Sequence, residues 1–423
     1  MKKTTHNLIS LTILGLLLNV KAMADSIPNA SAAVSPPQGI FNYQNDELLK
    51  KHVQFWIRIY SEFTTNQSLI HDAKYPEIIY EVVDLNKDAN DFNISSRDRE
   101  KRYQNKVKML KDYYTKVLLS IHKKKTDPSK LNEVEKRIAQ LFASVQEPNK
   151  FFNAAHGKRM RIQLGQKDRF QQGLYYSGRY LSAMEQIFRD KGVPVEITRL
   201  PFVESSFNLM ARSKVGASGI WQFMRSTGKL YLKINEITDE RNDPIRATHA
   251  AAELLKMNYE SLGSWSLAIT AYNHGRKGMM RAVRKIGSDQ LSDIIENYRS
   301  RSFGFASSNF YAEFLAALEV ERNTEKYFGK IERDKPVDFS EFVLNDFIDI
   351  HDLSTYSRIP LDSLLELNPC LTENVVKKKF LVPAGFSLRI PINMRDQFLV
   401  RYNLIPEHKK YASQKDALAL KKF

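Results

Sequence analysis

The sequence is poor in cysteine and has no second long apolar run. Cys370 is the one cysteine in 423 residues, so no disulfide can form within the chain and its stability must come from packing. After the apolar run of residues 8–20, no stretch approaches the roughly 18 uninterrupted apolar residues that span a bilayer. Glycine-rich phosphate loops, zinc-type cysteine spacings and metal-ligand clusters are also missing, so we expect neither a cofactor nor a metal.

Acidic residues are outnumbered by basic ones. The chain has 48 Asp and Glu against 64 Lys and Arg, which gives a net charge of +16. A positive field of this kind attracts an acidic partner, whether nucleic acid, anionic lipid or a carboxylate-bearing wall polymer. Charge alone does not choose among these partners, and basic runs such as residues 123–125 are equally well explained as solvated helix ends.

The N-terminus has the features of an export signal. Lys2 and Lys3 precede the apolar run, and residues 22–24 (A-M-A) form a small-residue cleavage site. We therefore expect residues 1–24 to be a signal peptide and the mature protein to be periplasmic or secreted, with no integral membrane segment. No cysteine stands at the cleavage site to carry a lipid anchor, and an exported protein is not expected to bind nucleic acid.

Composition divides the rest of the chain into five parts. Residues 25–45 are rich in Ser, Ala and Pro and are predicted to be a linker. Residues 46–164 are predicted to be a helical N-terminal region with no assignable chemistry, and residues 165–332 a helical domain. Residues 340–393 have β-like runs at their ends around a helical middle, which predicts a small α+β module. The tail, 394–423, is Lys-rich and predicted to be partly disordered. The predicted fold class is mainly α.

One carboxylate stands in a setting typical of a catalytic acid. Residues 200–222 read L-P-F-V-E-S-S-F-N-L-M-A-R-S-K-V-G-A-S-G-I-W-Q, with Glu204 between an apolar run and a glycine-punctuated turn. Pro201 places Glu204 at or near a helix end, beside Phe202 and Phe207. Apolar surroundings penalise the ionised form and keep a carboxyl protonated near neutral pH, as a general acid requires. The ordinary alternative is a surface or capping glutamate.

Three short motifs occur together in the middle of the chain. They are Glu204-Ser205, the G-A-S-G-I-W-Q of residues 216–222, and the A-Y-N of residues 271–273. In this order and spacing they resemble the soluble lytic transglycosylase family over roughly residues 165–330. The resemblance implies a lysozyme-like helical fold that cleaves the β-1,4 bond between N-acetylmuramic acid and N-acetylglucosamine and forms a 1,6-anhydro product without water.

The resemblance also implies roles for individual residues. Glu204 would be the sole acid and base, protonating the glycosidic oxygen and later taking the proton of the C6 hydroxyl that attacks the anomeric carbon. Most glycosidases use two carboxylates. No second one follows within residues 204–222, so the N-acetyl group would assist, with Ser213 close to it. The implied substrate-binding residues are Ser205, Ser213, Gly219, Trp221, Gln222, Tyr272, Asn273 and Tyr311.

Several of these residues also have structural explanations. Trp221, Tyr272 and Tyr311 could be core aromatics, Ser213 an ordinary cap, and His274 a structural histidine. His274 and Arg276 depart from the family pattern after the A-Y-N motif. Together with Lys277 they predict positive charge at the rim of the cleft and a preference for glycan that carries free stem-peptide carboxylates.

The C-terminal module resembles a diverged LysM repeat. Its first turn is echoed by residues 352–355, its second helix by residues 364–368 and its closing strand by residues 383–391, although His351-Asp352 replaces the usual glycine-aspartate opening. The module could therefore bind N-acetylglucosamine or be retained only for packing.

The predicted function is that of a peptidoglycan lytic transglycosylase, with glycan strands as partner. One alternative is a hydrolytic muramidase on the same fold, which would transfer the glycan to water. The other is a non-catalytic cell-wall-binding protein.

Overall fold

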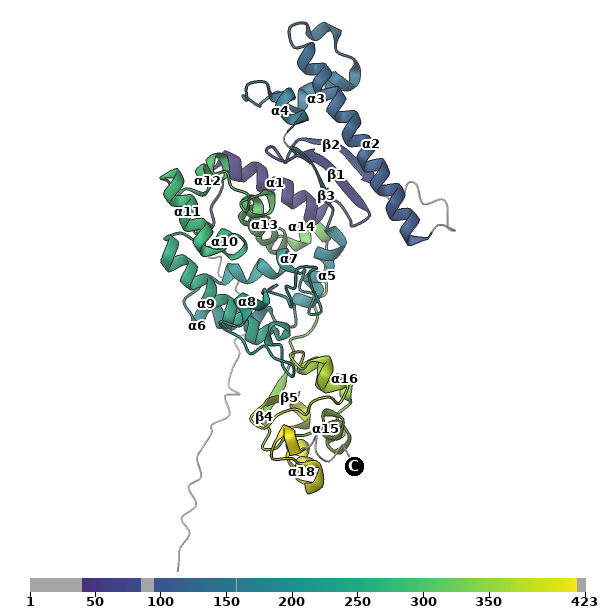
Figure 1. Cartoon of the computed structure of the whole chain (residues 1–423), viewed down its shortest axis with the longest axis vertical. Coiled ribbons are helices and arrows are strands. Elements are labelled where there is room, and N and C mark those ends of the chain that lie inside the picture. The colour runs from purple at the N-terminus through teal and green to yellow at the C-terminus, as the bar shows by residue number, and fades with distance from the viewer. Residues whose placement is uncertain (1–39, 85–94, 157, 417–423) are drawn as a thin grey trace, which may run out of the picture. The chain divides into compact units, whose positions relative to one another are not determined.

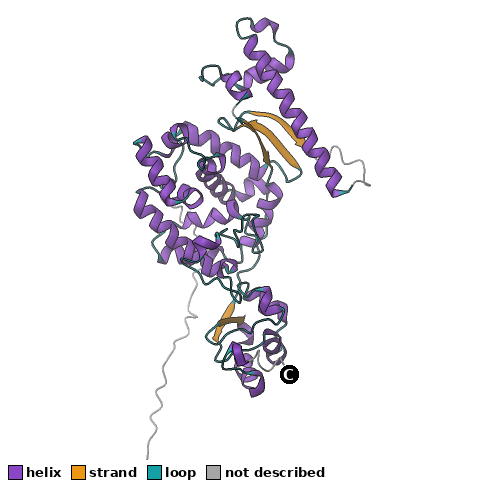
Figure 2. Cartoon of the chain, in the orientation of Figure 1, coloured by secondary structure: helices purple, strands orange, loops and turns teal. Residues whose placement is uncertain are grey.

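The computed structural model describes residues 40–84, 95–156 and 158–416 (Figure 1). The expected signal peptide and most of the expected linker lie outside these residues. The described chain is mainly helical, as predicted (Figure 2). No helix within it is long and apolar enough to cross a membrane.

The largest of three hydrophobic cores is built by helices from two distant parts of the sequence. Its members are α1 (Glu47–Ser61), α5 (Lys167–Ser177), α6 (Leu181–Asp190), α7 (Leu200–Glu204), α9 (Pro244–Leu262), α10 (Trp265–His274), α11 (Arg276–Ile286), α12 (Leu291–Asn297) and α13 (Phe305–Arg322), with the short α8 (Arg225–Gly228) and α14 (Thr324–Phe328) beside them. Two of its helices are capped by side-chain oxygens at their N-termini: Asp243 caps α9 and Ser264 caps α10. We call this unit the catalytic body, because it contains residues 165–332, the domain that the resemblance predicts to be catalytic.

Helix α1 belongs to the catalytic body although it precedes the predicted domain. It lies against α13, and the indole N–H of Trp56 donates to the amide oxygen of Asn309 over 3.0 Å. His52, Trp56 and Tyr60 are spaced four residues apart, so they share the face of α1 that meets α13. The predicted N-terminal region is therefore not one separate helical unit.

The same region contains a sheet that the sequence analysis did not expect. Strands β2 (Ile79–Asp84), β1 (Gln67–Asp72) and β3 (Met160–Leu164) pair antiparallel in that order. The prediction of helix is wrong for these residues. Strand β1 is buried on both faces: Leu69 belongs to the core of the catalytic body and Ile70 to a second core. A strand buried on both faces lacks the alternation of polar and apolar residues that would mark it.

The second core lies between the sheet and three helices. These are α2 (Ser96–Lys123), α3 (Glu133–Leu141) and α4 (Lys150–Ala155). Asp72 at the end of β1 is fully buried and is held by the Arg159 guanidinium at 2.8 Å, which also pairs with Glu147. This ion-pair network ties the end of β1 to the segments that flank α4.

Two buried histidines make the α1–sheet junction sensitive to acid. His52 Nδ1 and His71 Nε2 are buried with no hydrogen-bond partner among the described residues, and burial lowers the pKa of each to about 4. Because the folded-state pKa lies below the unfolded value, the unfolded chain binds more protons and stability falls as pH drops from about 6.5 toward 4.

We expect the free energy of unfolding to fall by roughly 3 kcal/mol between pH 7 and pH 5 from this pair. Urea titrations at both pH values measure the change. His52→Gln, which cannot take up a proton, should remove about half of it. His408→Gln, at an exposed position, should leave the pH dependence intact, and equal slopes for His52→Gln and the wild type would contradict the assignment.

The C-terminal module has the predicted order of elements. Antiparallel strands β4 (Phe339–Val343) and β5 (Ser387–Pro391) enclose α15 (Ile350–Ser357), α16 (Leu361–Leu367) and α17 (Glu373–Val376), and α18 (Arg395–Asn403) follows. The prediction of a weakly structured tail is wrong for α18, because Phe398 and Tyr402 are buried in the third core.

The module is joined to the catalytic body by buried polar contacts. Arg389 on β5 pairs with Asp243 over 2.8 Å, and both side chains are less than a tenth exposed. The backbone N–H of Asp239 donates to the carbonyl of Cys370 over 2.7 Å. Burial raises the pKa of the Cys370 thiol to about 12, so this cysteine is a packing residue in its unreactive form.

Candidate active site

Glu204 is the last residue of α7, as the sequence predicted, and its surroundings are aromatic. The ring of Phe202 stacks on that of Phe170 of α5, and the ring of Phe207 meets that of Phe202 edge-on. The ring centroids are 4.7 Å apart in both pairs. The carboxyl is half-buried and has no hydrogen-bond partner among the described residues. Desolvation raises the pKa of Glu204 to about 8, so the group is neutral and able to donate a proton at pH 7.

The backbone turns sharply directly after this carboxyl. Ser206 and Phe207 have φ of 51° and 55°, a left-handed conformation that residues with a side chain rarely adopt, least of all two in a row. The turn is held because the N–H of Phe207 donates to the carbonyl of Pro201 over 3.1 Å. Gly173 of α5 permits it, since a Cβ there would lie 2.9 Å from the carbonyl oxygen of Ser206.

A second carboxyl, on α13, lies within electrostatic reach of the first. Desolvation, and then the charge of Glu204, raise the pKa of Glu313 to about 8. Glu313 is also half-buried and without a hydrogen-bond partner in the part of the chain that the structure describes. Ionisation of either carboxyl opposes ionisation of the other, so the pair is neutral at pH 7.

Two tyrosines complete the surroundings of the carboxyl pair. Burial, followed by the charges of Glu313 and Glu204, raises the pKa of Tyr60 well above its usual value. Burial and then Glu204 do the same for Tyr272, whose hydroxyl donates to the carbonyl of Trp221 over 2.8 Å. Both hydroxyls therefore stay protonated. Tyr272 is brought to Glu204 as the resemblance implied.

The loop between α7 and α8 is fixed by its own polar side chains. Ser205 Oγ donates to the carbonyl of Ile220 over 2.9 Å, which ties the end of α7 to the loop. Gln222 Nε2 donates to the carbonyls of Ala211 and Gly219, and Ser213 Oγ accepts the N–H of Ala217. Ser205 and Gln222 thus position the loop, whereas Ser213 is half-buried and keeps a hydroxyl proton to offer.

Arg241 is a positioning residue that the sequence did not reveal. Its guanidinium is buried, pairs with Asp239 at 2.7 Å and donates to the carbonyls of Gly216, in the middle of the loop, and Phe223, near its end. Gly219 has φ of 76°, and a Cβ at this position would lie 1.8 Å from the Arg241 carbonyl oxygen. The close approach that requires this glycine is therefore to Arg241 rather than to a glycan.

Two predicted binding residues are corrected by their burial. Trp221 has no exposed surface, stacks on Phe188 and donates its N–H to Thr248, so it is a core residue. Tyr311 is 5% exposed and lies toward Asp46 at the start of α1. Tyr311 and Glu313 are two residues apart on α13, hence on nearly opposite faces, and Glu313 is the residue that faces Glu204.

Asn273 and His274 follow Tyr272 at the end of α10. Asn273 is exposed, and its Oδ1 accepts a hydrogen bond from Ser307 of α13 over 2.9 Å. His274 packs edge-on against Phe303 at 5.0 Å and against Gly278, which has no Cβ to exclude the ring. His274 is therefore structural, the explanation that the sequence analysis left open.

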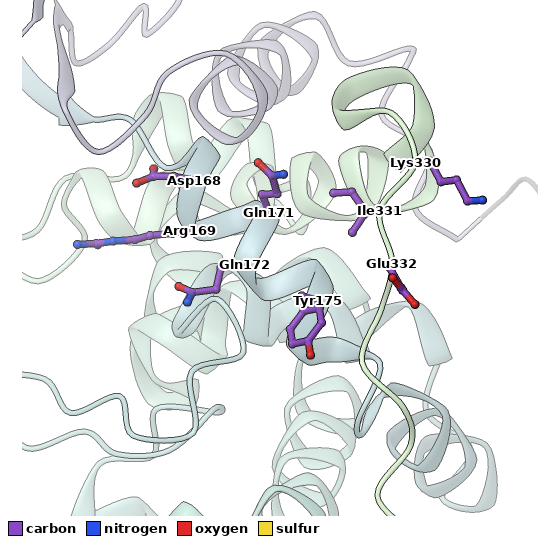
Figure 3. A pocket seen from close by; sticks show the side chains of 8 residues that line it. All are labelled: Asp168, Arg169, Gln171, Gln172, Tyr175, Lys330, Ile331 and Glu332. Carbon is purple, nitrogen blue, oxygen red and sulfur yellow. The ribbon is translucent and has the colours of Figure 1, made fainter.

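A surface pocket of about 530 Å³ lies elsewhere on the catalytic body (Figure 3). Gln171 and Ile331 face each other across it, whereas Arg169 and Lys330 point away. Its lining residues are Asp168, Arg169, Gln171, Gln172, Tyr175, Lys330, Ile331 and Glu332. Glu204 is not among them, so this pocket is not the catalytic site. Across the described ranges, no cluster of His, Cys, Asp or Glu is arranged to hold a metal ion.

Comparison with known proteins identifies a family domain within the catalytic body. Residues 184–295 match the family model of the Transglycosylase SLT domain, so the catalytic body carries a domain of this class, and the resemblance recognised from the three motifs is confirmed. Membrane-bound lytic murein transglycosylase D of Escherichia coli K12 is 30% identical over 141 residues, which are 33% of this chain and 30% of that protein. The match thus spans less than a third of the relative's length.

Two solved structures have weaker likeness. Lytic transglycosylase Slt of Pseudomonas aeruginosa is 18% identical with a TM-score of 0.30, covering 35% of this chain and 24% of its own. The 70 kDa soluble lytic transglycosylase of Escherichia coli is 18% identical with a TM-score of 0.26, covering 45% and 28%. Scores this low carry no information about the fold.

Proposed function

We propose that the chain is a peptidoglycan lytic transglycosylase that cleaves the β-1,4 bond between N-acetylmuramic acid and N-acetylglucosamine. The observation that carries the proposal is the neutral, half-buried carboxyl of Glu204, which has no partner to hold its proton. The Transglycosylase SLT domain match over residues 184–295 supports peptidoglycan as the substrate.

In the proposed reaction Glu204 acts first as acid and then as base. Its carboxyl gives a proton to the glycosidic oxygen while the bond from that oxygen to the anomeric carbon of N-acetylmuramic acid breaks. The N-acetyl group of the same sugar stabilises the anomeric carbon. The resulting carboxylate takes the proton of the C6 hydroxyl as the C6 oxygen bonds to the anomeric carbon. The 1,6-anhydro ring forms, and Glu204 regains its starting protonation state.

Electrostatics favours this cycle because the carboxylate exists only in mid-reaction. A pKa near 8 keeps Glu204 protonated before the reaction, and the desolvated carboxylate formed by proton transfer is a strong base. Tyr60, which interacts electrostatically with Glu204 and whose hydroxyl donates to no other described residue, can stabilise that transient charge, whereas the Tyr272 hydroxyl already donates to the carbonyl of Trp221.

Hydrolysis by a muramidase remains the second candidate, and Glu313 is the observation that favours it. Water-consuming glycosidases need a second carboxylate as base or nucleophile. A pKa near 8 makes Glu313 neutral at pH 7, so it is poorly suited to deprotonate water. Mass spectrometry of products from purified sacculi distinguishes the two reactions, because an anhydro end is lighter by one water than a hydrolytic end. Products with hydrolytic ends alone would overturn the proposal.

The pH dependence of the rate should report the same carboxyl. We expect kcat/KM to be flat from about pH 6 to pH 7 and to fall above pH 8, approaching tenfold per pH unit, as Glu204 loses its proton. Turbidity loss of sacculi at constant ionic strength measures this limb. A rate that rose between pH 7 and pH 9 would show that the ionised form of Glu204 is the active one.

Export and wall binding complete the proposal. The charge and apolar pattern of residues 1–24 supports delivery to the periplasm or the exterior. The LysM-like pattern of residues 340–393 supports a glycan-binding role for the C-terminal module. Its buried contacts with the catalytic body mean that a glycan held there would be held at a fixed distance from α9.

A further inference from the structure

Helix α11 carries five basic residues and no acidic one. Lys277, Arg281, Arg284 and Lys285 are exposed, Arg276 is half-buried, and within the described residues none of the five forms an ion pair. On α6, by contrast, Arg189 pairs with Glu185 of the same helix. The outer face of α11 is therefore an uncompensated cationic surface.

This distribution of basic residues destabilises α11. Arg276 and Lys277 lie in the first turn, where the helix dipole disfavours cations. Lys277, Arg281 and Lys285 repeat at four-residue spacing, which brings like charges together. A sequence that breaks two local rules on one helix, with no ion pair to a described residue to compensate them, is typical of a surface kept for a partner.

The position of α11 connects this surface to the catalytic residues. The helix begins at Arg276, directly after Gly275. Its first residue is four beyond Tyr272 and three beyond the exposed Asn273. Burial, and then the nearby charge of Arg281, lower the pKa of His274, which places Arg281 beside the end of α10. Met279 and Ala282 of α11 have no exposed surface, and Met280, at 42% exposed, is the large apolar side chain that the helix leaves at the surface. The helix therefore offers charge with too little exposed apolar surface to insert into lipid.

We propose that the outer face of α11, with Lys277, Arg281 and Arg284 at its centre, binds the carboxylates of the peptides attached to the glycan substrate. The inference rests on the proposed function, because a glycan held against Tyr272 and Asn273 would carry its peptide substituents past α11. Guanidinium groups match carboxylates in geometry as well as in charge, and the face has two of them with no other bound partner.

The test compares two substrates and two variants. Peptide-bearing sacculi and glycan strands freed of peptide by an amidase are digested, and anhydro products are counted by mass spectrometry. Lys277→Gln/Arg281→Gln/Arg284→Gln is expected to lose about tenfold in kcat/KM on the peptide-bearing substrate, the sum that three exposed charge contacts supply. Its rate on peptide-free strands should stay within about twofold of the wild type, and raising the salt should narrow the difference.

The matched control removes the same charge from α2. Lys108→Gln/Lys116→Gln/Lys123→Gln replaces three exposed lysines and is expected to behave as the wild type on both substrates. Equal loss on both substrates, or no loss on either, would overturn the inference. So would an α11 variant that loses sedimentation with anionic phospholipid vesicles while its substrate ratio is unchanged. Wild-type anhydro formation from the peptide-free strands tests the proposed function separately, so either idea can fail alone.

Discussion

Replacing Glu204 with Gln should abolish glycan cleavage while leaving the fold intact. The amide has the shape of the carboxyl but cannot donate its proton to the glycosidic oxygen, so we expect kcat/KM to fall by about 10³-fold or more. Because burial keeps the native carboxyl neutral at pH 7, the substitution changes no charge in the folded protein. The free energy of unfolding should therefore change by less than about 1 kcal/mol.

Product release from sacculi and a urea titration measure the two quantities. Glu260→Gln, at an exposed position on α9, is the matched control and should retain full activity. If Glu204→Gln kept the wild-type rate, the chain would have to be regarded as a non-catalytic wall-binding protein. A large loss of stability in the same variant would instead show that Glu204 has a structural role.

Replacing Gly219 with Ala should destabilise the loop between α7 and α8 more than any other single substitution described above. The new Cβ would have to displace the Arg241 backbone, which approaches to 1.8 Å, and φ of 76° would strain any side chain. We expect a loss of roughly 3 kcal/mol, about 1 from the left-handed backbone and the rest from overpacking. Activity should fall with it, since Gly219 also holds Gln222 through its carbonyl.

Gly216 in the same loop separates the cost of the left-handed backbone from the cost of overpacking against Arg241. It also has positive φ, at 91°, but a Cβ there would meet nothing within 4 Å. Gly216→Ala should therefore show only the backbone penalty of about 1 kcal/mol. Thermal melts of the two variants give the comparison, and equal shifts would mean that the approach of Arg241 does not matter.

The sequence predicted the parts of this site that depend on neighbouring residues. Glu204 falls at a helix end because Pro201 starts a short helix that the following turn stops. Asp243 and Ser264 start α9 and α10 because each side chain accepts a backbone N–H of the first turn. These are local effects, so a single stretch of sequence contains all the information they need.

The parts that it missed depend on pairing over long separations. Glu313 becomes a neighbour of Glu204 only when α13 packs against α7, although one acid within the apolar run N-F-Y-A-E-F-L could have marked it. Tyr60 likewise becomes a neighbour of Glu204 only when α1 packs into the catalytic body. Strand β2 had a signal in its β-branched Ile79, Val82 and Val83, but its sheet is completed by β3, far along the chain.

The ion pair between Arg389 and Asp243 has a consequence for how much of the chain the catalytic body needs. Asp243 starts α9, the helix that leads into α10 and Tyr272, and it does so as a buried anion whose nearer counter-charge, at 2.8 Å, comes from the last strand of the C-terminal module, while Arg246 of α9 lies at 3.7 Å. Removing one member of such a pair leaves an unneutralised charge away from water, which destabilises a protein more than the pair had stabilised it. A chain shortened ahead of β5 would keep every residue around Glu204 and still lack the cation that completes its scaffold.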